Sequence, residues 1–285
     1  MLGKLIKHDF RALSRTLFPL QIGILAGGLL ATLLTVLTIR LGENSVSTGA
    51  NIALRMITAT TSVLIGVAIA ASAFVTLLLI CIHFYRSFLC DEGYLTFTLP
   101  VSTSNLLWSK LLTGVFWMLI NAAVICVTIL LFAVFGTTSA GIINQGVLDS
   151  IKRLFTVFIP QAAQYVSIPL MIAEFVAVGL LAIASQLLEL YFAIIVGGQI
   201  AKKHRILAAI GMYLLINMGV GIISSVFISV VAFGEGLREI ALDTAQEISM
   251  FSVSVFGWNA VLYVGLCALF FLVSRSILKK NLNLQ

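Results

Sequence analysis

The sequence predicts an all-α protein that crosses a membrane six times, and composition and patterning together predict it. Hydrophobic residues make up 60% of the 285 residues and charged residues only 10%, with a mean hydropathy of +1.13. A soluble domain is nearer about 45–50% apolar and about 25% charged. A water-soluble globule cannot hide this much apolar surface, because much of any folded chain stays at its surface. These values exclude a soluble enzyme, a disordered chain and a nucleic-acid-binding protein.

Each predicted span is a long apolar run bounded by polar or charged residues. A helix needs about 20 apolar residues to cross the hydrocarbon core, because each residue advances about 1.5 Å. The runs lack the alternation of apolar and polar residues that barrel strands have. The first run is too long for a cleaved signal peptide and has no small-residue cleavage site. The expected spans, which form one transmembrane domain over residues 1–285, are 17–39, 56–85, 107–135, 167–198, 206–233 and 251–274.

Residues 1–16 predict a separate amphipathic helix that lies on the inner leaflet. Its apolar side chains recur at helical spacing, and its basic side chains lie off that face. The apolar members are Leu2, Leu5, Ile6, Phe10 and Leu13, and the basic members are Lys4, Lys7, Arg11 and Arg15. A plain positive flank of the first span is the alternative reading.

The distribution of lysine and arginine predicts that both termini are cytoplasmic. Twelve of the 17 basic residues fall on the side of the N-terminus, and five fall on the other side. Basic residues concentrate in cytoplasmic loops, so this excess fixes the orientation. A net charge of +6 is explained in the same way and needs no nucleic-acid partner.

Motifs for catalysis are missing from the sequence. There is no phosphate-binding loop with its lysine, no zinc-protease motif, no nucleophile elbow and no C-x-x-C pair. His8, His83 and His204 are far apart in sequence, so we expect membrane-edge histidines rather than a metal site. The chain is therefore expected to have no enzymatic activity and no cofactor of its own.

Among the polar side chains inside the predicted spans, five are candidates for a functional role. A carboxylate in a span costs a few kcal/mol, so it normally faces the bundle interior, water or a partner. Glu174, Gln186 and Glu189 fall near one stripe of the fourth span, which indicates a polar seam. The alternative is that Glu174 lies near the outer headgroups and Glu189 in a helix end within the cytoplasm. The candidate residues for a translocation path or a dimer contact are Asn121, Glu174, Gln186, Glu189 and Asn217.

The segment between the second and third spans has the most specific pattern. Asp91 can cap a short helix that Pro100 ends, and Ser102 can cap the next helix. Tyr94, Leu95 and Phe97 are apolar side chains on that short cytoplasmic helix, where no lipid covers them. Such a helix requires a protein groove. A tight helical hairpin without a partner is the alternative.

This segment resembles the ABC-2 type permease family, the membrane subunits of many bacterial ATP-binding cassette transporters. The shared pattern is an arginine at the exit of the second span, then D-E-G-Y-L-x-F-x-L-P-V-S and L-L-x-S-K-L-L. One departure is Asn105, where relatives often carry a charged residue. The resemblance implies a coupling helix at about Asp91 to Leu99 that docks on a separate ATPase. The coupling residues that it implies are Arg86, Asp91, Glu92, Tyr94, Leu95, Phe97 and Pro100.

The resemblance also implies what the protein does and where it works. It implies an exporter of a peptide, lipid or drug in the bacterial plasma membrane, powered by ATP and Mg²⁺ on the partner ATPase. A second permease copy or a sister permease, together with membrane lipids, completes the expected partners. The alternative function is a secondary transporter or channel that uses the intramembrane glutamates.

Overall fold

The computed structural model describes residues 2–43, 48–89, 101–136, 153, 156, 167–200, 204–239 and 244–281. Within these ranges the chain is helical and has no strand. The elements are α1 (Leu2–Glu43), α2 (Thr48–Leu89), α4 (Thr103–Leu131), the π-helical turn η1 (Phe132–Gly136), α8 (Ile168–Ile200), α9 (Arg205–Glu239) and α10 (Thr244–Asn281). In this part of the chain, six helices are long and apolar enough to cross a membrane.

Each of the six predicted spans falls on one of these helices, and the all-α class is confirmed. The start of α4 directly after Ser102 agrees with the predicted cap, and the Ser102 carbonyl accepts hydrogen bonds from the Asn105 and Leu106 amides. The start of α8 is similar, because the Ser167 carbonyl accepts from Leu170 and Met171. Pro169 lies in the first turn of α8, where a missing N–H breaks no helical bond.

Helix α1 does not end near residue 16, where the sequence places a boundary between an interfacial helix and the first span. It continues from Leu2 to Glu43 and contains Pro19. Proline removes one backbone donor, but the buried face runs on without a break through Leu13, Leu17 and Gln21. Packing along this continuous face keeps the helix intact.

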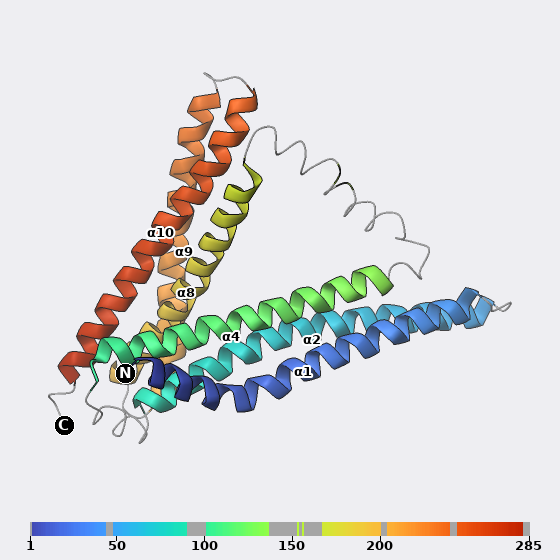
Figure 1. Ribbon diagram of the computed structural model, residues 1–285, viewed down its shortest axis with the longest axis horizontal. Helices are drawn as coiled ribbons and strands as arrows, with labels where there is room; N and C mark the ends of the chain where they lie inside the picture. Colours follow the sequence, from blue (N-terminus) through green and yellow to red (C-terminus); the bar gives the residue numbers. More distant parts are fainter. Residues whose placement is uncertain are drawn as a thin grey trace. The chain divides into compact units, whose positions relative to one another are not determined.

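The chain divides into two compact units. One contains Met1–Asp9, Cys81–Val115 and Ile159–Gln285, and the other contains Phe10–Ile80 and Phe116–Phe158. In the first unit α8, α9 and α10 run side by side, and α8 contacts both of its neighbours (Figure 1). The core of this unit includes a buried stack of Phe84 on Tyr191, with ring centroids 3.9 Å apart and planes within 5°.

In the second unit, the long parts of α1, α2 and α4 run side by side (Figure 1). Its packing includes Phe10, whose ring stacks on Trp117 and meets Phe116 edge-on, with both centroid distances 5.3 Å. Thr128 on α4 lies against Gly28 on α1, where a Cβ would come within 2.5 Å of the threonine methyl group. Each described helix also has exposed large apolar side chains, as a lipid environment requires.

The close approach of α8 and α9 depends on Gly197. A Cβ added there would lie 2.4 Å from the Ala209 Cα and 2.5 Å from the Ala209 nitrogen. Both atoms belong to the backbone, so Gly197→Ala must push the helices apart. We expect a loss of about 1–3 kcal/mol and a lower Tm in detergent.

Gly179→Ala is the matched control on the same helix, because nothing lies within 4 Å of the added Cβ. Equal Tm values for the two alanine variants would contradict the packing described here.

Candidate functional site

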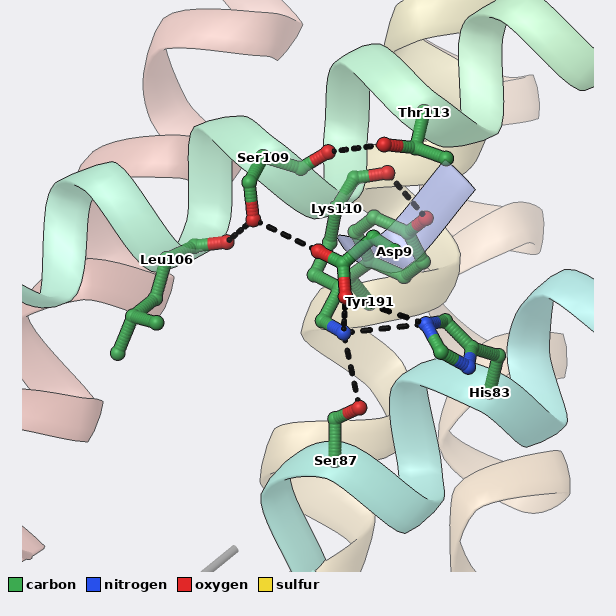
Figure 2. A network of polar contacts seen from close by, with 8 residues as sticks. All are labelled: Asp9, His83, Ser87, Leu106, Ser109, Lys110, Thr113 and Tyr191. Atoms are coloured by element: carbon green, nitrogen blue, oxygen red, sulfur yellow. Dashed lines mark hydrogen bonds and ion pairs between the residues drawn. The ribbon is translucent and has the colours of Figure 1, made fainter. Parts of the chain in front are cut away.

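A buried ion pair joins the first turns of α1 to the start of α4. Lys110 on α4 donates from Nζ to the Asp9 Oδ1, and Ser109 donates from Oγ to the Asp9 Oδ2 at 2.9 Å. Lys110 also donates to the Ser87 Oγ at 2.9 Å and contacts the His83 Nε2 at 3.1 Å. We call Asp9, His83, Ser87, Ser109 and Lys110 the Asp9–Lys110 cluster (Figure 2).

The helices position the members of this cluster by simple spacing. His83 and Ser87 are four residues apart on α2, so both face the same side of that helix. Ser109 and Lys110 are consecutive on α4, and the Ser109 Oγ also lies 3.0 Å from the Leu106 carbonyl, which shares the one hydroxyl proton with Asp9. The backbone of α4 continues the network, because the Ser109 carbonyl accepts from the Thr113 hydroxyl at 2.7 Å (Figure 2).

The charges of this cluster are removed from solvent. Only 4% of Asp9 and 7% of Lys110 is exposed, and Ser109 is fully buried. Removing two ions from water costs several kcal/mol each, and only good geometry with further hydrogen bonds repays that cost. This cluster satisfies that condition, so the pair is compatible with burial only as long as both partners are present.

Helix α8 supports the cluster from behind. The Tyr191 hydroxyl donates to the Lys110 carbonyl at 3.3 Å, and the Tyr191 ring stacks on Phe84, one residue from His83. The end of α2 is held as well, since Arg205 donates from Nη1 to the Leu89 carbonyl at 3.0 Å. The Leu89 side chain lies against Gly198, where a Cβ would come within 2.6 Å. The residues that precede and follow segment 90–100 are therefore held by contacts within one unit.

The cluster contains two side chains of the kinds that ligate metal ions, Asp9 and His83. Among the described residues, no group of three or more His, Cys, Asp or Glu side chains is placed to ligate one. The Lys110 ammonium contacts both Asp9 and His83, and the His83 Nε2 lies 3.5 Å from the Asp9 Oδ1. The charges of the cluster therefore join α1, α2 and α4.

A second polar site lies between α8 and α9, where the sequence predicts a seam. Asn217 donates from Nδ2 to the Glu189 Oε1 at 3.3 Å, and Gln186 donates from Nε2 to the Tyr213 hydroxyl at 2.9 Å. Glu189 is buried, with 4% exposed. Gln186, Glu189 and Asn217 thus meet at one interface. Glu174, which is half-buried, lies on the same helix four turns toward its N-terminus.

Asn121 belongs to the other unit and to a different network. It donates from Nδ2 to the Thr76 hydroxyl at 3.0 Å and to the Gln21 Oε1 at 3.3 Å. The Gln21 amide also donates to Thr76 at 3.4 Å, and all three side chains are buried. The network joins α1, α2 and α4 as a helix bridge, which is the usual role of asparagine in a span.

The residues predicted to couple to an ATPase lie mostly outside the described part of the chain. This holds for Asp91, Glu92, Tyr94, Leu95, Phe97 and Pro100. Arg86, the one described member of that set, is exposed on the last turn of α2.

Sequence reasoning missed Asp9 and included Lys110 as part of the L-L-x-S-K-L-L pattern. The sequence contains a signal for Asp9, because this residue lies on the same stripe as Ile6, Leu13 and Leu17 rather than with the basic residues. A charge on the apolar face of an amphipathic helix requires a buried partner of opposite charge.

Comparison of the chain with protein-family models, with curated proteins and with solved structures finds no match. The two polar sites and the helix arrangement are therefore the basis for a functional proposal, together with the resemblance of residues 84–112.

The Asn121 network supports a stability prediction. Asn121→Leu removes the donor shared by Gln21 and Thr76 and leaves the Gln21 oxygen buried without that partner. We expect a loss of about 1 kcal/mol, typical of a hydrogen bond between membrane helices, and a lower Tm in detergent. Ala122→Leu, at the next position on an exposed face of α4, is the control. A Tm for Asn121→Leu at or above that of the parent protein would show that the network contributes nothing.

Proposed function

We propose that this chain is the permease subunit of an ATP-binding cassette transporter of the ABC-2 type. It works in a bacterial plasma membrane with both termini in the cytoplasm, and it exports a hydrophobic or amphipathic substrate. A separate ATPase subunit supplies ATP hydrolysis, and a second permease copy or sister permease completes the assembly. The pattern of residues 84–112 carries this proposal, because a polar segment with unshielded apolar side chains requires a protein groove.

The six apolar helices and the anchoring around segment 90–100 support this proposal. A segment that transmits force must be attached firmly at both ends, since a slack attachment would absorb the movement. His83, Ser87 and Leu89 precede the segment and Ser109 and Lys110 follow it, and all five are held by contacts within one unit. Movement of the ATPase would therefore act on α2 and α4 together.

We expect the transport cycle to use this attachment. Closure of the ATPase on ATP pushes the segment, and the push passes into α2 and α4 at their cytoplasmic ends. The two helices continue across the membrane, so the displacement reaches the lipid-embedded part of the chain. The apolar bundle, with few charges in its spans, suits a cargo that is itself apolar or amphipathic.

Tyr94→Ala combined with Phe97→Ala tests the coupling segment. Burying one large apolar side chain is worth about 1.5–3 kcal/mol, so losing two should weaken ATPase binding by at least a hundredfold. The measurement is recovery of a P-loop ATPase with the detergent-solubilised chain, identified by mass spectrometry and by photolabelling with an ATP analogue.

The matched control is Val63→Ala with Leu64→Ala, which removes apolar side chains that are 65% and 66% exposed in the middle of α2. Equal ATPase recovery by the loop variant, with transport intact, would refute the proposed coupling role.

A second candidate function rests on Glu189. A buried carboxylate in a span, held by the Asn217 amide, is also what a secondary transporter or channel uses to bind a proton or a cation. In that case substrate flux would follow an ion gradient and need no ATPase.

Glu189→Gln separates the two functions. The amide keeps the shape and much of the hydrogen bonding, so we expect a Tm close to that of the parent and a transport rate at least about tenfold lower. Flux in liposomes is measured under an ion gradient alone and again with ATPase and ATP. Glu174→Gln on the same helix is the control. Gradient-driven flux that disappears in Glu189→Gln would favour the secondary transporter, and full ATP-driven flux in this variant would leave Glu189 without a transport role.

A further inference from the structure

We infer that Asp9 and Lys110 form an ionic lock that makes residues 2–9 part of the base of segment 90–100. The first turns of α1 are then not a helix that rests loosely on the leaflet. Together with the end of α2 and the start of α4, these turns form the structure to which both ends of segment 90–100 are attached. Asp9 and Lys110 are positioning residues, because they act on the segment through the helices that carry it.

Three side chains of the cluster lie within reach of the Lys110 ammonium. It donates to the Asp9 Oδ1 and the Ser87 Oγ, and the His83 Nε2 lies 3.1 Å from the Lys110 Nζ and 3.5 Å from the Asp9 Oδ1. The other Asp9 oxygen accepts from Ser109. The carboxylate is thus the only negative charge among the five side chains of the cluster.

The lock joins three separate parts of the chain. His83 and Ser87 lie shortly before segment 90–100, and Ser109 and Lys110 lie shortly after it. Asp9 is 101 residues from Lys110 in sequence, so their ion pair joins two segments that are distant along the chain. If Asp9 were lost, the cluster would lose the carboxylate that pairs with the buried Lys110 ammonium.

The packing of the chain points to the same group of residues independently of the hydrogen bonds. Met1–Asp9 belongs to the compact unit that contains Cys81–Val115, whereas α1 from Phe10 onward belongs to the other unit. The division of α1 falls directly after the lock residue. Residues 2–9 therefore belong to the same compact unit as the residues that flank segment 90–100.

One consequence concerns coupling, and this part depends on the proposed function. When an ATPase displaces segment 90–100, the lock carries the displacement into the start of α1 as well as into α2 and α4. The exposed Lys4 and Lys7 lie on those turns, so the same movement shifts the basic face of the helix. A permease with a broken lock would bind ATPase but lose transport.

Amide hydrogen exchange tests the lock in the purified full-length chain, with no ATPase present. Asp9→Asn keeps the side-chain shape but removes the negative charge that pairs with Lys110, and Lys110→Met keeps much of the length but removes the positive charge that pairs with Asp9. We expect each single variant to raise exchange in peptides from residues 2–16 at least tenfold. The double variant Asp9→Asn with Lys110→Met removes both charges of the pair, so its exchange should fall back toward that of the parent. Lys7→Met, an exposed charge change on the same turns, is the matched control and should change nothing.

The outcomes separate the lock from the proposed function. Parental exchange in both single variants, or exchange in the double variant that equals the sum of the singles, would overturn the lock. If the single variants fail to accumulate in membranes and the double variant does accumulate, the charge dependence is supported. If the double variant also fails to accumulate, the lock is overturned, because charge pairing then does not explain the loss.

Coupling is measured afterwards as substrate flux per ATP hydrolysed, in single variants that still recover the ATPase. A fall in this ratio supports transmission through the lock, and an unchanged ratio overturns transmission while the exchange result stands. Absence of any ATPase partner would refute the proposed function without affecting the lock.

Discussion

A charge that leaves water must meet an opposite charge, and the arrangement at the start of α1 follows from that requirement. Lys110 occurs on a face of α4 whose neighbours Leu107 and Leu111 are buried. Lys110 is itself buried, so the ammonium needs a buried acceptor, and Asp9 supplies a negative one. Once the pair forms, the first turns of α1, the end of α2 and the start of α4 must lie together.

The same requirement acts on neutral polar groups in both units. In one unit Asn121 satisfies Gln21 and Thr76, and in the other Asn217 and Gln186 bridge α8 to α9. Apolar packing gives little selectivity between membrane helices, because lipid tails are as apolar as leucine. These hydrogen bonds therefore fix which helix faces meet, and small residues such as Gly197 let the backbones approach closely enough.

The sequence was sufficient for the helices because apolar length is a property of consecutive residues. All six spans were located in this way, and helical spacing placed Gln186 and Glu189 on one stripe of α8, with Glu174 of the predicted seam four turns away. The hydrogen-bond partners of Gln186 and Glu189 are Tyr213 and Asn217, which lie 27 and 28 residues away, on another helix, and only Asn217 was singled out. Pairing across helices depends on rotation and register, which no local pattern records.

The first helix illustrates why periodicity alone did not predict the remaining features. Leu2, Ile6, Leu13 and Leu17 give the same stripe whether it faces lipid headgroups or a protein core, so periodicity alone favours neither. Asp9 distinguishes the two cases. On a leaflet surface its carboxylate would stay hydrated, whereas in a protein core it needs a partner of opposite charge. Lys110 is 101 residues away in sequence, and the contact between them turns an apparent surface helix into part of the packed unit. An acidic residue on the apolar stripe of a basic amphipathic helix is therefore physical grounds for expecting a protein partner for that face rather than a lipid one.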